Sequence, residues 1–138
     1  MFLLDTNVVS ELRQGKANPS AAVRAWAAAQ PIHVLYISAV TQLELEIGVL
    51  RMARRDEPQA SILRRWLTAV MAQFEGRVLP FGTLTVQHCA PLHVPDQRAF
   101  RDSMIAATAL EHGFTVVTRN VSDFEGLVAL VNPWGATP

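Results

Sequence analysis

The chain has 138 residues, of which half are hydrophobic and 17% are charged, so it can bury a core and is too apolar to remain disordered. Twelve basic and twelve acidic residues give a formal net charge of zero, which is not the basic balance of a protein dedicated to binding duplex DNA. Any contact with nucleic acid must therefore come from a local patch or a specific motif.

The first half of the sequence predicts two strands and four helices. An apolar run at the N-terminus and a β-branched, apolar run before residue 38 have the composition of short buried strands. Elsewhere apolar residues recur at helical spacing, and Pro58 stands near the start of the last helix, where proline is tolerated. The predicted strands cover residues 2–4 and 34–37, and the predicted helices cover residues 8–15, 20–30, 40–54 and about 57–74.

The second half predicts three further strands and two helices. Gly76 and Gly113 stand where glycine commonly ends a helix, and the prolines at both ends of residues 91–95 indicate a loop. The predicted strands cover residues 78–79, 115–118 and 127–131, and the predicted helices cover residues 84–92 and 102–111. Because strands alternate with helices, we expect a three-layer α/β/α fold with a central, mainly parallel sheet. No repeat or linker divides the sequence, so a single domain over residues 1–138 is expected.

Cysteine content and hydropathy indicate a cytoplasmic protein. Cys89 is the only cysteine, so an internal disulfide is impossible, and we expect a buried, unreactive thiol. The N-terminus lacks the basic region and the long apolar run of a signal peptide. No apolar stretch approaches the roughly 20 residues that a membrane span requires. We therefore expect no membrane association.

Four acidic residues are predicted to meet at one edge of the sheet, because parallel sheets bind ligands at the carboxyl ends of their strands. Asp5 follows the first strand, and Asp123 follows the strand over residues 115–118. Glu44 lies one to two turns into the helix after the second strand, and Asp102 opens the helix that leads into residues 115–118. Crowded carboxylates repel unless a cation neutralises them, and Mg²⁺ prefers oxygen ligands. The arrangement favours a divalent metal site.

Each of these acids also has a purely structural interpretation. Asp5 suits a turn or a helix cap, and Asp102 suits an N-cap or a first-turn position favoured by the helix dipole. Glu44 alone is typical of a solvated helix residue, and Asp123 of a turn. Spacing by itself leaves the metal site and the structural interpretation about equally open.

Four segments and a short C-terminal motif resemble those of PIN-domain nucleases, especially the VapC/FitB-like toxins of type II toxin–antitoxin systems. They are residues 2–7 (FLLDTN), 37–45 (ISAVTQLEL), 102–109 (DSMIAATA), 118–126 (TRNVSDFEG) and 132–134 (NPW). Each segment is short, but their order across nearly the whole chain makes the resemblance specific.

The resemblance implies a set of site residues. Its acidic metal-site positions fall on Asp5, Glu44, Asp102 and Asp123. Asn120 falls where some relatives carry another acid or a polar group. Asn7 is expected to orient Asp5 by hydrogen bonding, and Thr118 to have a minor supporting role.

The resemblance also implies a function. The chain is similar to metal-dependent endoribonuclease toxins, which hydrolyse RNA phosphodiester bonds with metal-activated water, with Mg²⁺ as cofactor and Mn²⁺ as a possible substitute. Its implied partners are an RNA substrate, a second copy of the chain in a homodimer, and a cognate antitoxin. In this family the antitoxin blocks the site, often with a basic side chain, and can join the toxin to DNA.

Two other functions remain open. One is a non-catalytic PIN-like binding module that acts through its antitoxin partner, with acids that only cap turns. The other is a metal-dependent phosphatase that acts on small phosphate esters. Metal titration of an Asp5→Asn variant separates the first from the nuclease, and a chromogenic ester assay reveals the second.

Several positions depart from the family pattern or lack a clear role. Arg101 precedes Asp102, where a small or apolar residue is commoner, and is predicted either to reach a phosphate or to pair with a neighbouring carboxylate. Gly82 and Thr83 stand where many relatives have an acidic residue. The apolar helices over residues 40–74 exceed what a small monomer is expected to bury, and the family resemblance implies that they form a homodimer face and a groove for the antitoxin. Basic residues on these helices suit a solvated surface, an RNA patch or an acidic partner; they are Arg51, Arg54, Arg55, Arg64 and Arg65.

Overall fold

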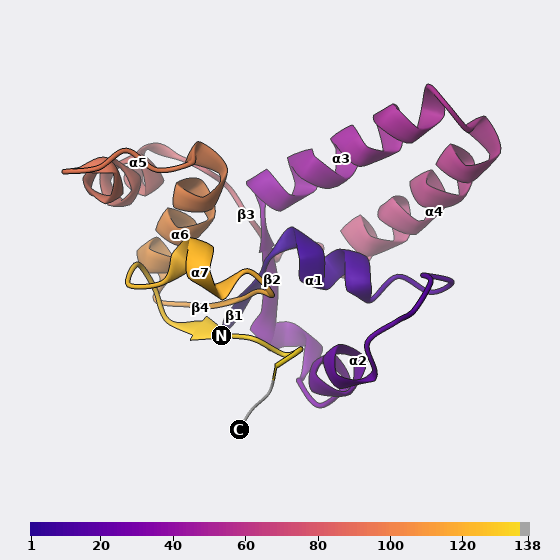
Figure 1. Cartoon of the computed structure of the whole chain (residues 1–138), viewed down its shortest axis with the longest axis horizontal. Helices are drawn as coiled ribbons and strands as arrows, with labels where there is room; N and C mark the ends of the chain where they lie inside the picture. The colour runs from indigo at the N-terminus through magenta and orange to yellow at the C-terminus, as the bar shows by residue number, and fades with distance from the viewer. Residues whose placement is uncertain (136–138) are drawn as a thin grey trace.

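A computed structural model describes residues 1–135 of the chain, and a parallel sheet of five short strands lies at its centre (Figure 1). The strands are β1 (Phe2–Leu4), β2 (Leu35–Ser38), β3 (Val78–Leu79), β4 (Thr115–Val117) and β5 (Leu130–Val131). Their order is β3-β2-β1-β4-β5, and every neighbouring pair is parallel. Leu3 of β1 lies beside Tyr36 of β2 on one side and Val116 of β4 on the other. The predicted parallel sheet is confirmed.

Helices cover both faces of this sheet. They are α1 (Thr6–Glu11), α2 (Ala21–Ala28), α3 (Ala39–Ala53), α4 (Glu57–Gln73), α5 (Thr83–Cys89), α6 (Phe100–His112) and α7 (Val121–Phe124), with 3₁₀ helices η1 (Ile32–Val34) and η2 (Ala90–His93). In Figure 1, α1 to α4 lie on one side of the sheet, and α5 to α7 lie on the other. The predicted three-layer α/β/α architecture is therefore confirmed.

Two separate cores hold the layers together. Successive strand residues point to opposite faces of a sheet, so Leu4 and Val117 pack under α1 to α4, whereas Leu3 and Val116 pack under α6 and α7. All four side chains are buried, because a sheet covered on both faces requires apolar residues at every strand position. This explains why the strands appear in the sequence as continuous apolar runs.

Short polar residues turn the chain from strand into helix at one edge of the sheet. Asp5 directly follows β1 and caps α1, with its carboxylate accepting a hydrogen bond of 2.7 Å from the Thr6 N–H. Ser38 ends β2 and caps α3, with its hydroxyl accepting from the Thr41 N–H at 3.1 Å. Both caps satisfy N–H groups that a helix start leaves without an intrahelical partner. The two helices therefore begin side by side above the carboxyl ends of adjacent strands.

Several predicted boundaries are corrected by the structure. Helix α6 begins at Phe100, so Asp102 lies in its first turn rather than at its start. The predicted loop around Asp123 contains the short helix α7, because the fully buried Phe124 anchors that turn in the core. The last strand is shorter than residues 127–131, and part of the predicted loop over residues 91–95 belongs to η2.

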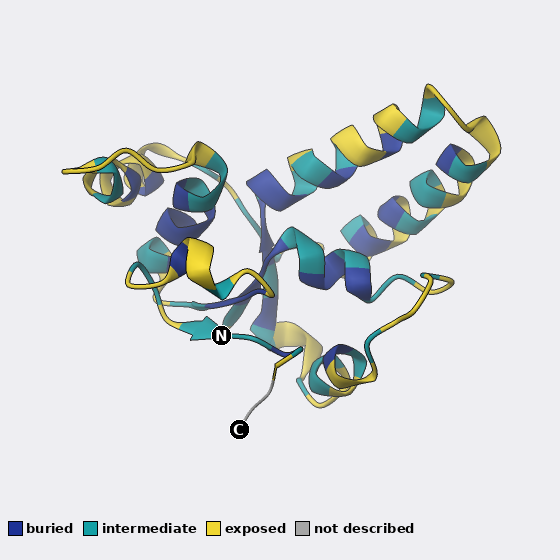
Figure 2. Cartoon of the chain, viewed as in Figure 1, coloured by how far each residue is buried: buried dark blue, intermediate teal, exposed yellow. Residues whose placement is uncertain are grey.

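The hairpin of α3 and α4 extends beyond the sheet and carries many exposed residues (Figure 2), some of which are apolar. Leu43 is 58% exposed, Leu50 61% and Ile62 47%. The expectation that these helices exceed what the monomer buries is confirmed. Arg64 forms an ion pair of 2.8 Å with Glu46 on this hairpin, as expected of a solvated helical surface. Within the described residues, no helix is both long and apolar enough to cross a membrane.

A buried glutamate joins α1 to α2. Glu11 is 5% exposed, accepts a hydrogen bond of 2.7 Å from the Ser20 N–H and forms an ion pair of 3.3 Å with Lys16. The hydrogen bond from Ser20 lowers the pKa of the Glu11 carboxyl, burial opposes this effect, and the positive charges of Lys16 and Arg24 lower the pKa further. Glu11 thus fixes the loop between the two helices in its ionised form.

We predict that Glu11→Gln destabilises the chain at neutral pH and has progressively less effect in acid. The folded pKa of Glu11 lies below its unfolded value of about 4.3, so the stabilisation is present above that value and is lost as pH falls through the folded pKa. Urea unfolding at pH 7 and near pH 3.5 measures the difference from wild type. Glu75→Gln, at an exposed position after α4, is the control. If Glu11→Gln lowered the free energy of unfolding by the same amount at both pH values, the prediction would be contradicted.

Candidate active site

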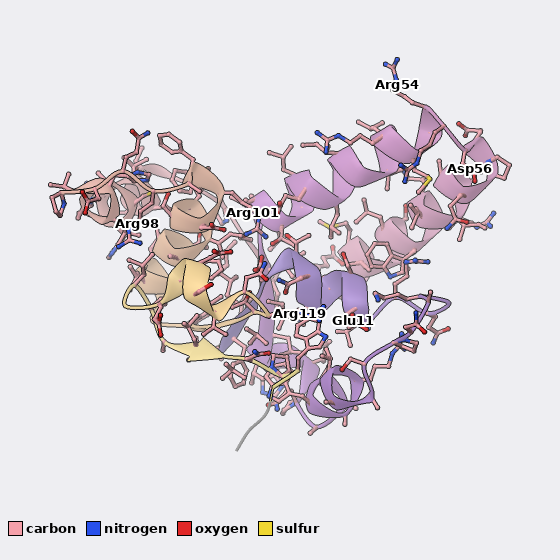
Figure 3. The ribbon with its side chains drawn as sticks, viewed as in Figure 1. Glu11, Arg54, Asp56, Arg98, Arg101 and Arg119 are labelled. Atoms are coloured by element: carbon pink, nitrogen blue, oxygen red, sulfur yellow. The ribbon has the colours of Figure 1, made fainter. Side chains whose placement is uncertain are left out.

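Three of the four predicted acids meet around one guanidinium group. Arg101 donates from Nη2 to Asp5 Oδ1 at 2.5 Å, from Nε to Glu44 Oε2 at 2.7 Å and from Nη1 to Asp102 Oδ1 at 2.7 Å. Figure 3 shows Arg101 between α6 and the start of α3. The acids come from segments that are distant in sequence, so this cluster exists only in the folded chain.

The sheet topology places the cluster. Strand β1 lies between β2 and β4, so the chain leaves β1 toward one side and later returns on the other. Ligands of parallel sheets bind in the crevice that this reversal opens outside the carboxyl ends of the strands. Asp5 directly follows β1, Glu44 lies on the helix after β2, and Asp102 lies on the helix before β4. The predicted edge of the sheet is therefore the one at which these three acids meet.

Asp5 is held by neutral donors as well as by Arg101. Thr118 Oγ1 donates to Asp5 Oδ2 at 2.8 Å, and Asn7 Nδ2 lies 3.4 Å from the same oxygen. The Asp5 side chain is completely buried. The hydrogen bond expected between Asn7 and Asp5 is present, and Thr118 makes the shorter contact. The Asn120 N–H donates to Thr118 Oγ1 at 3.0 Å, which links the start of α7 to this group.

Thr6 orients Glu44 and contacts a second threonine, Thr41. Thr6 Oγ1 donates to Glu44 Oε1 and lies 3.1 Å from Thr41 Oγ1. Thr6 directly follows Asp5, and Thr41 precedes Glu44 by three residues on one face of α3. That helical spacing is the signal that identifies Thr41 from the sequence. Arg101 was noticed as a departure, and of its two predicted roles the structure shows pairing with carboxylates.

The cluster carries excess negative charge. Three carboxylates face one guanidinium, so two of the three negative charges have no positive partner among the Arg101 contacts. Burial lowers the pKa of the Arg101 guanidinium, but hydrogen bonds and charge from Glu44, Asp5 and Asp102 together raise the pKa above its ordinary value. Arg101 is therefore a permanent cation here, and it neutralises only part of the acidic charge.

The donor set suits a hard divalent cation. Carboxylates and hydroxyls supply only oxygen, which Mg²⁺ prefers at about 2.1 Å. Across residues 1–135, however, no group of three or more histidine, cysteine, aspartate or glutamate residues has the spacing to hold a metal ion. Each of the three carboxylates contacts a different nitrogen of the planar Arg101 guanidinium, which therefore lies among them. The acids fit a metal by chemistry and are separated by the guanidinium.

Asp123, the fourth predicted acid, lies apart from these contacts. It is exposed on α7, and within the described part of the chain no hydrogen bond or ion pair joins it to Arg101 or to the three clustered acids. Its helix follows β4 closely, at the carboxyl edge of the sheet. A role of Asp123 in the site remains a prediction.

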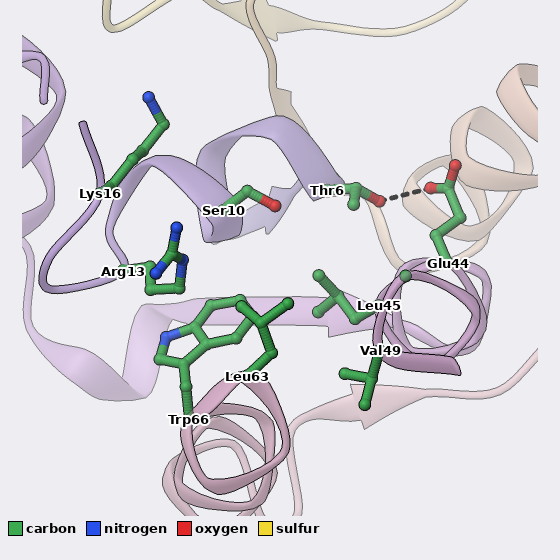
Figure 4. Close-up of a pocket in the computed structure, with 10 residues that line it drawn as sticks. Thr6, Ser10, Arg13, Lys16, Glu44, Leu45, Val49, Leu63 and Trp66 are labelled. Carbon is green, nitrogen blue, oxygen red and sulfur yellow. Dashed lines mark hydrogen bonds between the residues drawn. The ribbon is translucent and has the colours of Figure 1, made fainter. Parts of the chain in front are cut away.

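A cavity of about 290 Å³ adjoins the acidic cluster. Glu44 belongs to both and Thr6 lines the cavity. Figure 4 shows the Thr6–Glu44 hydrogen bond at one end of the cavity, with Arg13 and Lys16 toward the other end. The half-buried Trp66 packs against the core and forms part of the cavity wall. The cavity therefore has acidic and basic ends.

Comparison with known proteins identifies the family. The sequence profile of the PIN domain matches residues 2–125. The chain is 40% identical to VapC ribonuclease Y4jK of Sinorhizobium fredii, over 97% of this chain and 98% of the relative. It is 34% identical to toxin FitB of Neisseria gonorrhoeae, over 97% of this chain and 99% of that relative. The solved structure of FitAB bound to an IR36 DNA fragment matches with a TM-score of 0.86 and 32% identity, over 100% of this chain and 99% of that one. This chain therefore belongs to the PIN domain family.

Proposed function

We propose that this chain is a metal-dependent endoribonuclease and the toxin of a toxin–antitoxin pair. The observation that carries the proposal is the convergence of Asp5, Glu44 and Asp102 at the carboxyl edge of the sheet. The relatives support the substrate class, because one is named a VapC ribonuclease and another a toxin. We further propose that residues 1–138 form one PIN domain and act in the cytoplasm.

In this proposal Asp5, Glu44 and Asp102 bind Mg²⁺, with Mn²⁺ as a substitute, and Asp123 contributes directly or through water. The ion would supply a Lewis acid that activates water and offsets charge on the phosphodiester. Thr118 and Asn7 hold Asp5, and Thr6 holds Glu44, so these carboxylates are oriented before the metal binds. Asn120 supports the site through its backbone contact with Thr118.

The cavity beside the cluster is the proposed path of the RNA. Its basic end carries Arg13 and Lys16, which suits the phosphate groups of a nucleic acid backbone. Lys16 is already paired with Glu11, so Arg13 is the cation more available to a phosphate. An RNA chain lying in this cavity would pass the Thr6–Glu44 contact and thereby reach the acids. Hydrolysis there adds the oxygen of water to phosphorus and breaks one P–O ester bond, whose leaving oxygen takes a proton.

The proposed protein partners are a cognate antitoxin and a second copy of the chain. The FitAB structure contains DNA, whereas this chain has a formal net charge of zero, so we assign DNA contact to the antitoxin within a larger assembly. The exposed apolar residues of α3 and α4, among them Leu43 and Leu50, favour a homodimer face.

A non-catalytic binding module is the second candidate function. It is favoured by one observation, namely that Arg101 pairs with the three acids in the folded chain. Under this alternative the acids and Arg101 form a structural network, and the chain acts by holding its antitoxin.

We predict that the antitoxin-free protein cleaves RNA when Mg²⁺ or Mn²⁺ is present. Asp5→Asn and Asp102→Asn should each lower the cleavage rate roughly 100-fold or more, because each removes a charge that binds the metal. Asparagine also caps helices, so Asp5→Asn leaves the start of α1 intact. Cleavage of a labelled RNA, with and without chelator, measures the effect. Asp56→Asn is the matched control, since Asp56 caps α4 at the tip of the hairpin.

Two results would contradict the nuclease. Intact RNA under every condition, from folded protein that still binds its antitoxin, favours the binding module. Hydrolysis of a chromogenic phosphate ester without cleavage of RNA indicates a phosphatase.

Asp123→Asn is expected to lower RNA cleavage about tenfold, as for a residue that contacts the metal directly or through water. The change removes an exposed charge from α7 and leaves the buried Phe124 in place, so folding should be preserved. Cleavage rates across a Mg²⁺ titration measure it. A rate equal to wild type at every Mg²⁺ concentration would place Asp123 outside the site.

Arg13→Ala is expected to weaken the binding of single-stranded RNA about five- to tenfold, because one phosphate contact is lost. For the same reason, the slope of log affinity against log salt concentration should become shallower by about 0.7. Fluorescence anisotropy in chelator measures binding without cleavage. Arg54→Ala removes the same charge at the far end of α3 and is the control. An equal loss in both variants would show that general charge, rather than the cavity, binds RNA.

A further inference from the structure

We propose that Arg101 competes with the divalent cation for the acidic cluster. Its guanidinium holds Asp5, Glu44 and Asp102 when no metal is bound, and it must leave them for the metal to enter. The proposal rests on the metal site proposed above and adds to it an internal competitor that sets the affinity for the metal.

The competition follows from which oxygen atoms are occupied. Arg101 takes Asp5 Oδ1, Glu44 Oε2 and Asp102 Oδ1, one with each of its three nitrogens. Neutral donors take two more oxygens, since Thr118 and Asn7 contact Asp5 Oδ2 and Thr6 contacts Glu44 Oε1. Five of the six carboxylate oxygens therefore accept hydrogen bonds. A metal ion drawing on these carboxylates would lie beside the guanidinium, where like charges repel.

Charge decides the direction of the exchange. With Arg101 in place the three carboxylates retain two unmatched negative charges, and a dication compensates one charge more than the guanidinium does. The Arg101 side chain is 32% exposed, so solvent weakens its ion pairs. The guanidinium is therefore a displaceable cation, which holds the acids apart without closing the site to a divalent ion.

The position of Arg101 in the chain makes the competition constant. It lies in the first turn of α6, beside Asp102, so its guanidinium stays close to the cluster at any salt or metal concentration. A tethered competitor acts at a fixed effective concentration and lowers the apparent affinity of the metal by a fixed factor. Arg101 thereby raises the metal concentration that the site needs.

The test is Mn²⁺ binding by isothermal titration calorimetry, with chelator-treated, full-length protein and no RNA. Arg101→Gln is expected to bind Mn²⁺ about tenfold more tightly than wild type, which lies within the roughly 5- to 150-fold range of typical couplings between binding events in one protein. Arg101→Lys keeps the charge but cannot engage three carboxylates in a planar fork, so it should fall between them. Arg119→Gln is the control, because it removes an equal charge from a side chain that lies over the Trp134 ring. The Mn²⁺ affinity of this variant should match that of wild type.

Thermal unfolding gives a second readout that needs no catalytic activity. Without metal, Arg101→Gln leaves three carboxylates without their cation, so its unfolding temperature should lie below that of wild type. Saturating Mn²⁺ should raise the unfolding temperature of Arg101→Gln by more than that of wild type, because tighter binding stabilises more. If Arg101→Gln fails to fold in chelator, the ordering of wild type and Arg101→Lys decides the question.

The outcomes separate this proposal from the proposed function. Equal or weaker Mn²⁺ binding by Arg101→Gln, with binding abolished by Asp5→Asn, overturns the competition and supports the metal site. Absence of Mn²⁺ binding in wild type and in both Arg101 variants overturns the metal site and the competition together. Tighter binding by Arg101→Gln that Asp5→Asn abolishes supports both.

Discussion

The repulsion among three carboxylates at one edge of a parallel sheet is the constraint on which the rest of the site depends. Asp5 is completely buried, so its charge requires partners, and it receives them from Arg101, Thr118 and the Thr6 N–H. Glu44 is oriented in the same way by Arg101 and Thr6. The network is incompletely neutralised, and this remaining negative charge is the physical basis of the proposed metal site.

Asp5 combines a structural role with a place in the acidic cluster. The same carboxylate caps α1 and pairs with Arg101, so the start of the helix also positions an acid of the proposed metal site. The structural interpretation of Asp5 and the metal-site interpretation are thus compatible. The two carboxylate oxygens of Asp5 accept hydrogen bonds from different donors. Oδ1 accepts from the Thr6 N–H and Arg101, and Oδ2 accepts from Thr118.

The PIN domain family describes the fold of this chain, and the contacts of Arg101 describe how its acidic cluster is partly neutralised. The family match covers residues 2–125, nearly the whole fold. The contacts of Arg101 on α6 with Asp5 and Glu44 place a guanidinium among the acids. In this chain the positive charge that meets the acids is supplied from within the folded domain.

The sequence by itself determined the layers of the fold, the parallel sheet and the edge at which Asp5, Glu44 and Asp102 meet, because strand composition, helical periodicity and residues that follow strands are local properties. Only the tertiary structure decided the partners of these acids. Arg101 and Asp5 are 96 positions apart, and Thr118 and Asp5 are 113 apart, so no local pattern relates them. The placement of Asp123 was likewise settled by the burial of Phe124, which turns a predicted loop into α7. Side-chain contacts of this kind depend on packing between distant elements, and packing is a property of the folded chain alone.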